Sequence, residues 1–158
     1  MTVQQRIKPA PITWTGQVPL APAAAFDLFL GRMHQWWMPA HSLLKVPVKE
    51  IVIEPRPGGR WYEIGTDGSQ EQWGKVVEWD PPHRALLHWQ LNADFTFDPG
   101  LETEVEISFT PHGDGTRVAF EHRNLELFGE RAEELRSGMG GGWSALLDGF
   151  VARAKAEG

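Results

Sequence analysis

Apolar and polar residues alternate along most of the chain, which is the pattern of β-strands that bury one face. The clearest case is segment 101–110, where Thr103, Val105, Ile107 and Phe109 share one face and glutamate and serine residues take the other. Clusters of proline, glycine and aspartate separate this segment from others of the same kind. The pattern predicts strands over residues 12–18, 48–54, 60–65, 71–79, 84–91, 101–110 and 116–123.

Helical periodicity occurs in two places. After the first strand, Pro22 suits the first turn of a short helix through Phe26 and Leu30, and a second short helix or turn covers residues 31–38. The segment 129–158 is a candidate for a long terminal helix, because an apolar stripe recurs at helical spacing from Trp143 onward. These elements predict an α+β fold in which a curved antiparallel sheet wraps around the C-terminal helix.

A run of glycines precedes that apolar stripe. Gly138, Gly140, Gly141 and Gly142 leave two interpretations open. They form either a thin wall beside the mouth of a cavity, or an ordinary loop before a helix that begins near Gly142. A glycine inside a helix costs about 0.5–1 kcal/mol relative to alanine, which favours the loop.

Composition narrows the classes of function. A chain of 158 residues suits a single domain, here 12–157, after a mobile N-terminal segment 1–11. The net charge of −6 argues against nucleic acid as a partner, and the absence of cysteine excludes disulfides and thiolate metal sites. Without a secretion signal or a membrane-spanning stretch, we expect a cytoplasmic protein and no membrane partner. Eight tryptophans and eight phenylalanines against one tyrosine are typical of a thick core or an apolar pocket.

Several segments, taken in their order and spacing, are similar to one family. They are EPRPGGRW at 54–61, GKVVEWDPP at 74–82 with LHW at 87–89 behind it, GTRV at 115–118, and Gly142-Trp143 followed by Leu146 and Leu147. Together they resemble the START-like (SRPBCC) superfamily over residues 12–156, and within it the branch named for the C-terminal domain of the activator of the heat-shock chaperone ATPase.

The resemblance implies a helix-grip fold, in which seven antiparallel strands grip a long C-terminal helix and a hydrophobic cavity lies between them. The superfamily uses this cavity to bind lipids, sterols, hormones or polyketides, and some members cyclise a polyketide inside it. Function must still be argued from the site, because one fold hosts many functions.

The candidate site residues are mostly aromatic. They either line a ligand pocket or fill the core: Trp37, Trp61, Trp73, Trp89, Phe120 and Trp143, with Leu147 on the apolar stripe of the terminal helix. Two polar candidates share a strand face with members of this set, Glu63 with Trp61 and His122 with Phe120. His88 lies on the face opposite to Trp89, so only one of the two points inward. A single inward histidine is more often structural than catalytic.

Three functions remain open. The first is binding of a small hydrophobic or aromatic ligand by a monomer or homodimer, without a cofactor. The second is a cyclase or hydrolase that uses His122 and Glu63 as acid and base in the same cavity. The third is a chaperone co-factor, as the family name suggests. We expect no metal, because His34 and His41 are seven residues apart with no carboxylate near them, and the row Glu102, Glu104 and Glu106 is most simply a solvated face.

Overall fold

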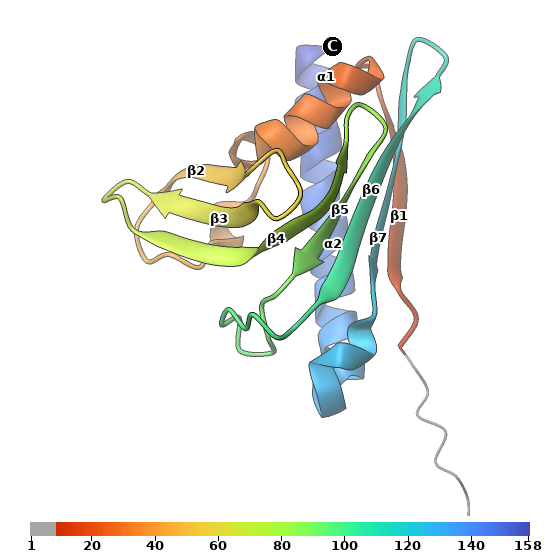
Figure 1. Cartoon of the computed structure of the whole chain (residues 1–158). Coiled ribbons are helices and arrows are strands. Elements are labelled where there is room, and N and C mark those ends of the chain that lie inside the picture. The colour runs from red at the N-terminus through yellow and green to blue at the C-terminus, as the bar shows by residue number, and fades with distance from the viewer. Residues whose placement is uncertain (1–8) are drawn as a thin grey trace, which may run out of the picture.

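The computed structural model describes residues 9–158 and shows a curled antiparallel sheet packed against one long helix (Figure 1). The segment expected to be mobile, 1–11, falls mainly on residues 1–8, which lie outside the described residues. In chain order the elements are β1 (Ile12–Val18), α1 (Pro22–Phe26), the π-helical turn η1 (Asp27–Gly31), the 3-10 turns η2 (Met33–Gln35) and η3 (Pro39–His41), β2 (Val48–Ile53), β3 (Arg60–Gly65), β4 (Gln70–Asp80), β5 (Arg84–Trp89), β6 (Thr103–His112), β7 (Gly115–Arg123), η4 (Leu125–Arg131) and α2 (Ala132–Glu157).

The seven strands form one sheet in the order β1-β7-β6-β5-β4-β3-β2. Strands β2 to β7 follow one another as an antiparallel meander, and β1 joins the far edge, where Ile12 lies opposite His122. The short helices after β1 carry the chain across to the other edge of the sheet (Figure 1). The predicted α+β architecture of seven strands and a long C-terminal helix is therefore confirmed.

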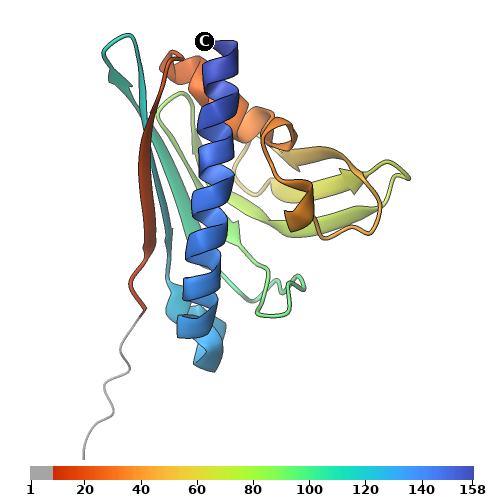
Figure 2. The ribbon, with the colours of Figure 1, turned by 180° about the vertical axis from the view of Figure 1, so that it is seen from behind.

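The inner face of the sheet carries the alternation that the sequence predicted. Thr103, Val105, Ile107 and Phe109 of β6 are at most 2% exposed. They face α2, which runs along the concave side of the sheet (Figure 2). The helix contributes a buried stripe of its own, formed by Trp143, Leu146, Leu147, Phe150 and Ala154. This shared core fixes the distance between sheet and helix, and so the shape of any space that remains between them.

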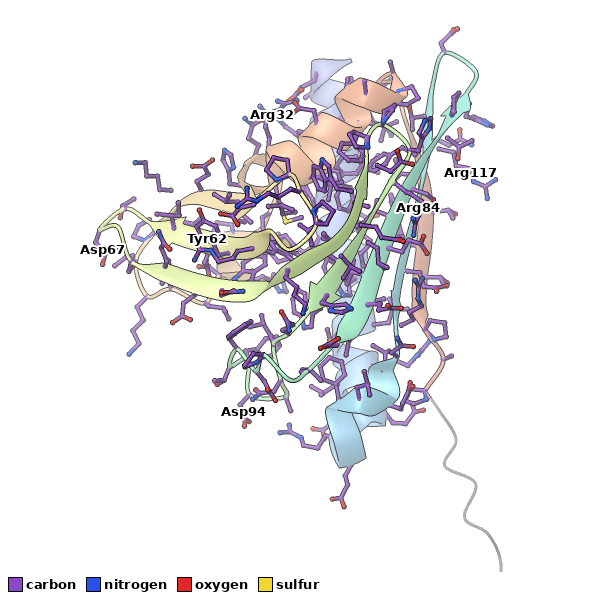
Figure 3. The ribbon with its side chains drawn as sticks, in the orientation of Figure 1. Arg32, Tyr62, Asp67, Arg84, Asp94 and Arg117 are labelled. Carbon is purple, nitrogen blue, oxygen red and sulfur yellow. The ribbon has the colours of Figure 1, made fainter. Side chains whose placement is uncertain are left out.

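The outer face is held by ion pairs. Arg123 on β7 lies 3.0 Å from Glu104, 2.7 Å from Glu106 and 3.1 Å from Glu121, and Arg84 (Figure 3) lies 2.7 Å from Glu106. The hydrogen bond from Arg123 is the main reason that the pKa of Glu106 is lowered. Of the acidic row, Glu104 and Glu106 are therefore half-buried and paired with arginines, whereas Glu102, just before β6, is exposed as the sequence predicted.

The glycine run lies inside α2, so the expected loop before Gly142 is wrong. The helix starts at Ala132, which is itself buried, and its C-terminal half is anchored by the apolar stripe. Packing at both ends of the helix offsets the weak helix propensity of the glycines between them. Within the described part of the chain, no helix is long and apolar enough to cross a membrane.

Candidate functional site

A pocket with a volume of about 320 Å³ lies between the sheet, the loop after β5 and the N-terminal half of α2. Four tryptophans, from β4, β5, α2 and the link between η2 and η3, form its inner wall: Trp37, Trp73, Trp89 and Trp143. Most of the other lining side chains are apolar: Leu43, Leu91, Phe95, Leu135, Met139 and Leu146. The volume is at the lower end of the range for small-molecule sites, about 300–1,000 Å³.

The four tryptophans, called here the tryptophan quartet, contact one another in a closed cycle. The ring centroids are 4.8 Å apart for Trp37 and Trp73, 6.2 Å for Trp73 and Trp89, 5.4 Å for Trp89 and Trp143, and 5.8 Å for Trp143 and Trp37. The rings meet in tilted or edge-to-face arrangements, which aromatic pairs prefer. The quartet is therefore a wall whose members hold one another in place.

Three indole N–H groups of the quartet are bonded to protein acceptors. Trp37 donates to the carbonyl oxygen of His41 at 3.4 Å, Trp73 to the carboxylate of Glu63 at 3.2 Å, and Trp143 to Nδ1 of His122 at 3.2 Å. Each donor is thereby occupied by the protein itself. The rings consequently offer the pocket mainly their apolar surfaces.

His122 is fully buried and sits in a chain of hydrogen bonds that fixes its protonation. The Thr103 hydroxyl donates its only proton to the carbonyl oxygen of Trp89 at 2.7 Å, so the 2.9 Å contact with Nε2 of His122 must be donated by the imidazole. Nδ1 accepts from Trp143. The ring is therefore neutral with its proton on Nε2, and burial lowers its pKa to about 3. His122 orients Trp143 and is in no position to act as a base.

Glu63 is also fully buried, but its carboxylate bonds to other parts of the chain and does not line the pocket. Its carboxylate accepts from the hydroxyl of Ser42 and from the backbone N–H of Leu43, both at 2.6 Å, and from the indole of Trp73. The first two donors belong to the segment after η3, which forms one side of the pocket. Glu63 thus fastens that segment to β3 and β4.

The nine residues expected from the sequence fall into two layers. The quartet lines the pocket, while Trp61, Phe120 and Leu147 lie behind it in the core. Ring centroids of Trp61 are 5.5 Å from Trp73 and 5.6 Å from Trp89. Those of Phe120 and Trp143 are 4.6 Å apart. Glu63 and His122 hold quartet members from outside the pocket. Whether any of the nine contacts a ligand stays a prediction.

Strand parity also decides which side chains of β5 point towards the pocket. Trp89 faces the pocket, whereas His88 lies on the outer face, 3.6 Å from Glu102. Gly74 lies opposite Trp89 on β4, and a side chain at this position would collide with the carbonyl oxygen of His88. The close approach of β4 and β5 at Trp89 therefore requires a glycine.

The glycines of α2 form part of the pocket wall. Gly138 and Gly142 line it, whereas Gly140 and Gly141 do not. A methyl group added at Gly138 would meet nothing within 4 Å, so this position opens onto free space. The placement agrees with the interpretation of a thin wall, which the sequence left as an alternative.

Sequence reasoning missed the residues from the loop after β5 and from the first turns of α2. Leu91 and Phe95 come from the loop, and Leu135 and Met139 from the helix. The only available signal was the i, i+4 spacing of Leu135 and Met139, which continues the apolar stripe of α2 through the glycines. Nothing in the alternation of the strands pointed to the loop.

Few groups in the lining can take part in proton transfer. His41 and Glu134, both exposed at the rim, are the titratable side chains that line the pocket in the described part of the chain. Residues 9–158 contain no cluster of three histidine, aspartate or glutamate side chains that could hold a metal ion. The arrangement is suited to enclosing an apolar molecule.

The chain is similar to known proteins in both sequence and structure. The family model described as Activator of Hsp90 ATPase homolog 1-like protein matches residues 21–155. Among proteins of curated function, none matches the sequence significantly.

Three solved structures illustrate the range of similar proteins. The self-sacrificing resistance protein CalC from Micromonospora echinospora is 30% identical, with a TM-score of 0.71, and the match covers 94% of this chain and 96% of CalC. The anthrahydroquino-gamma-pyrone synthase Txn09, complexed with SUM, is 29% identical, with a TM-score of 0.63 and coverage of 92% and 97%. The Aha1 dimer from Colwellia psychrerythraea, at 13% identity, a TM-score of 0.65 and coverage of 92% and 96%, shares the fold alone.

Proposed function

Given that this chain belongs to the family of Activator of Hsp90 ATPase homolog 1-like proteins, within the START-like superfamily, we propose that it binds a small, flat, largely apolar ligand in the pocket beside α2. The observation that carries the proposal is the tryptophan quartet, a preformed wall with three of its N–H groups already bonded within the protein. A planar ligand makes the most contact with such a wall, because it can stack on one ring and meet the edges of others.

One similar protein, Txn09, supports the same class of ligand. Txn09 is named as an anthrahydroquino-gamma-pyrone synthase, a name that denotes fused rings, and the match covers 92% of this chain at 29% identity. A fused aromatic ring system is planar, so it can stack on one ring of the quartet and meet the edges of others. The match supports a ligand of this shape for the present pocket as well.

A reaction in the pocket is the second candidate, and the synthase is the observation that favours it. His122 is an unsuitable base, because its pKa is lowered to about 3 and Nδ1 already accepts from Trp143. A reaction would therefore have to use His41 or Glu134 at the rim. Loss of turnover in His41→Ala, with binding retained, would identify such an enzyme.

The binding proposal is tested with a neutral three-ring probe, 9-(hydroxymethyl)anthracene, titrated by isothermal calorimetry. In Gly138→Leu the new side chain enters the pocket, and we expect binding to be lost. The matched control is Gly141→Leu, which lies one turn further along the same helix, also faces free space and does not line the pocket. Both variants replace a helical glycine, so both should keep or gain stability. Equal affinity of wild type and Gly138→Leu would refute the proposal.

A further inference from the structure

Phe95 is an exposed aromatic side chain at the entrance of the pocket. It lies in the loop between β5 and β6, next to Asp94, which is marked in Figure 3. Its exposed fraction is 52%, and among described residues only Met38 and Leu127 are other large apolar side chains that are classed as exposed. An apolar ring left in solvent at a pocket mouth gains from being covered.

The backbone of Phe95 is held in an unfavourable conformation. Its φ angle is 57°, in the left-handed region that residues other than glycine rarely adopt. Asn92 keeps it there, because its side-chain oxygen accepts from the N–H groups of Asp94 at 2.9 Å and Thr96 at 3.0 Å, and its carbonyl accepts from Phe95 at 2.9 Å. Strain of this kind at a binding site is often part of its function.

Phe95 also joins the pocket to a second one. The outer pocket, of about 610 Å³, shares His41, Leu43 and Phe95 with the inner pocket. Its remaining lining is more polar and includes the carboxylates of Glu71 and Asp94. Within the described residues no lysine or arginine lines either pocket, although Arg131 approaches Asp94 to 3.7 Å from outside.

We propose that Phe95 is a clamp that stacks on the ligand at the junction of the two pockets, and that the part of the ligand passing it into the outer pocket is polar and carries no negative charge. The inference rests on the proposed binding function and adds a contact residue and a ligand class to it. The strained loop presents the ring in advance, so that little ordering is needed when the ligand binds. An anionic end would meet the carboxylates of Glu71 and Asp94, with no lysine or arginine among the described lining residues to offset them.

The clamp is tested by replacing Phe95 with residues that suit a left-handed backbone. In Phe95→Gly and Phe95→Asn we expect the affinity for 9-(hydroxymethyl)anthracene to fall about ten-fold, as for the loss of one aromatic stack. The urea midpoint should stay the same or rise, because the strain is relieved. If Phe95 had a purely structural role, both the affinity for the probe and the urea midpoint would fall. The matched control is Leu127→Ala, an equally exposed apolar residue outside both pockets, for which we expect no change in affinity.

The ligand class is tested with three probes that share the anthracene body. We expect 9-(aminomethyl)anthracene and the 9-hydroxymethyl compound to bind the wild type, and anthracene-9-carboxylate to bind about five-fold or more weakly at low salt. Equal or tighter binding of the carboxylate would overturn the inference that the part of the ligand in the outer pocket carries no negative charge. Unchanged affinity in both Phe95 variants would overturn the clamp, and in either case the pocket would still stand as the binding site. Binding of none of the three probes to the wild type would refute the proposed function together with this inference.

Discussion

Replacing His122 with phenylalanine should change how the stability of the protein depends on pH. The imidazole is buried among Thr103, Trp89 and Trp143 with no charged partner, and its pKa falls from 6.5 to about 3 on burial. As pH falls through 6.5, the unfolded chain takes up a proton that the folded protein does not. The native state is therefore fully stabilised above that pH and loses stability as the pH falls towards about 3.

The size of the effect follows from linkage. Each pH unit between the two pKa values contributes about 1.4 kcal/mol, so about 2 kcal/mol is lost by roughly pH 5. This figure depends little on the folded-state pKa, provided that it lies well below 5. His122→Phe lacks the titrating group but leaves the indole N–H of Trp143 without its acceptor, which costs about 1–3 kcal/mol at neutral pH. The variant should therefore be less stable than the wild type at neutral pH. The gap, meaning the difference in free energy of unfolding between the two proteins, should narrow by about 2 kcal/mol in acid.

Urea unfolding, followed by circular dichroism at about pH 7.5 and about pH 5, measures both gaps. The burial-lowered pKa of His88 contributes to the pH dependence of both proteins and cancels in the difference. His112→Asn, which removes one exposed histidine at the end of β6, is the control for the loss of an imidazole. A gap of the same size at the two pH values would show that the imidazole is not kept neutral in the fold, and would refute the assigned hydrogen-bond chain.

Three further perturbations test other parts of the structure. Gly140→Ala should stabilise the protein by about 0.5–1 kcal/mol in urea unfolding, since the position faces free space within a helix; a loss of stability would show that the glycine is required. Glu63→Gln should cost about 1–3 kcal/mol, because an amide cannot accept from all three donors; a neutral result would contradict the buried carboxylate. Arg123→Ala should cost about 1–2 kcal/mol at low salt and less in concentrated salt, because three glutamates lose their shared partner. A cost independent of salt would assign the loss to packing alone.

The sequence predicted the strands and the helix that have one buried, apolar face and one polar face. The alternation around Val105 and Ile107 could be assigned because β6 has a buried and a polar side. The apolar stripe from Trp143 onward identified the helix for the same reason. The glycine run was misjudged because local propensity opposes a helix there, and only the packing of distant segments decides the outcome.

The candidate site was predictable only in part. Parity placed His122 and Trp89 on faces that could point inward. It could not show that both ring nitrogens of His122 would be hydrogen-bonded, one to Thr103 and the other to Trp143. Phe95 was beyond reach, since its position depends on hydrogen bonds to Asn92 within an irregular loop. Periodicity reports which face is buried, whereas the bonds that specify a site join residues far apart in the sequence.

The pairing of β1 with β7 has a consequence for the order in which the protein assembles. Strand β1 leaves the ribosome long before its partner, because Ile12 pairs with His122 and Val18 with Thr116. Until β7 has been synthesised, the nascent chain must carry the apolar residues Ile12 and Val18 without their native neighbours. The meander from β2 to β7 can form by local hairpins in the meantime. Closure of the sheet by β1 is then a late, long-range event, because it must wait until β7 has been synthesised.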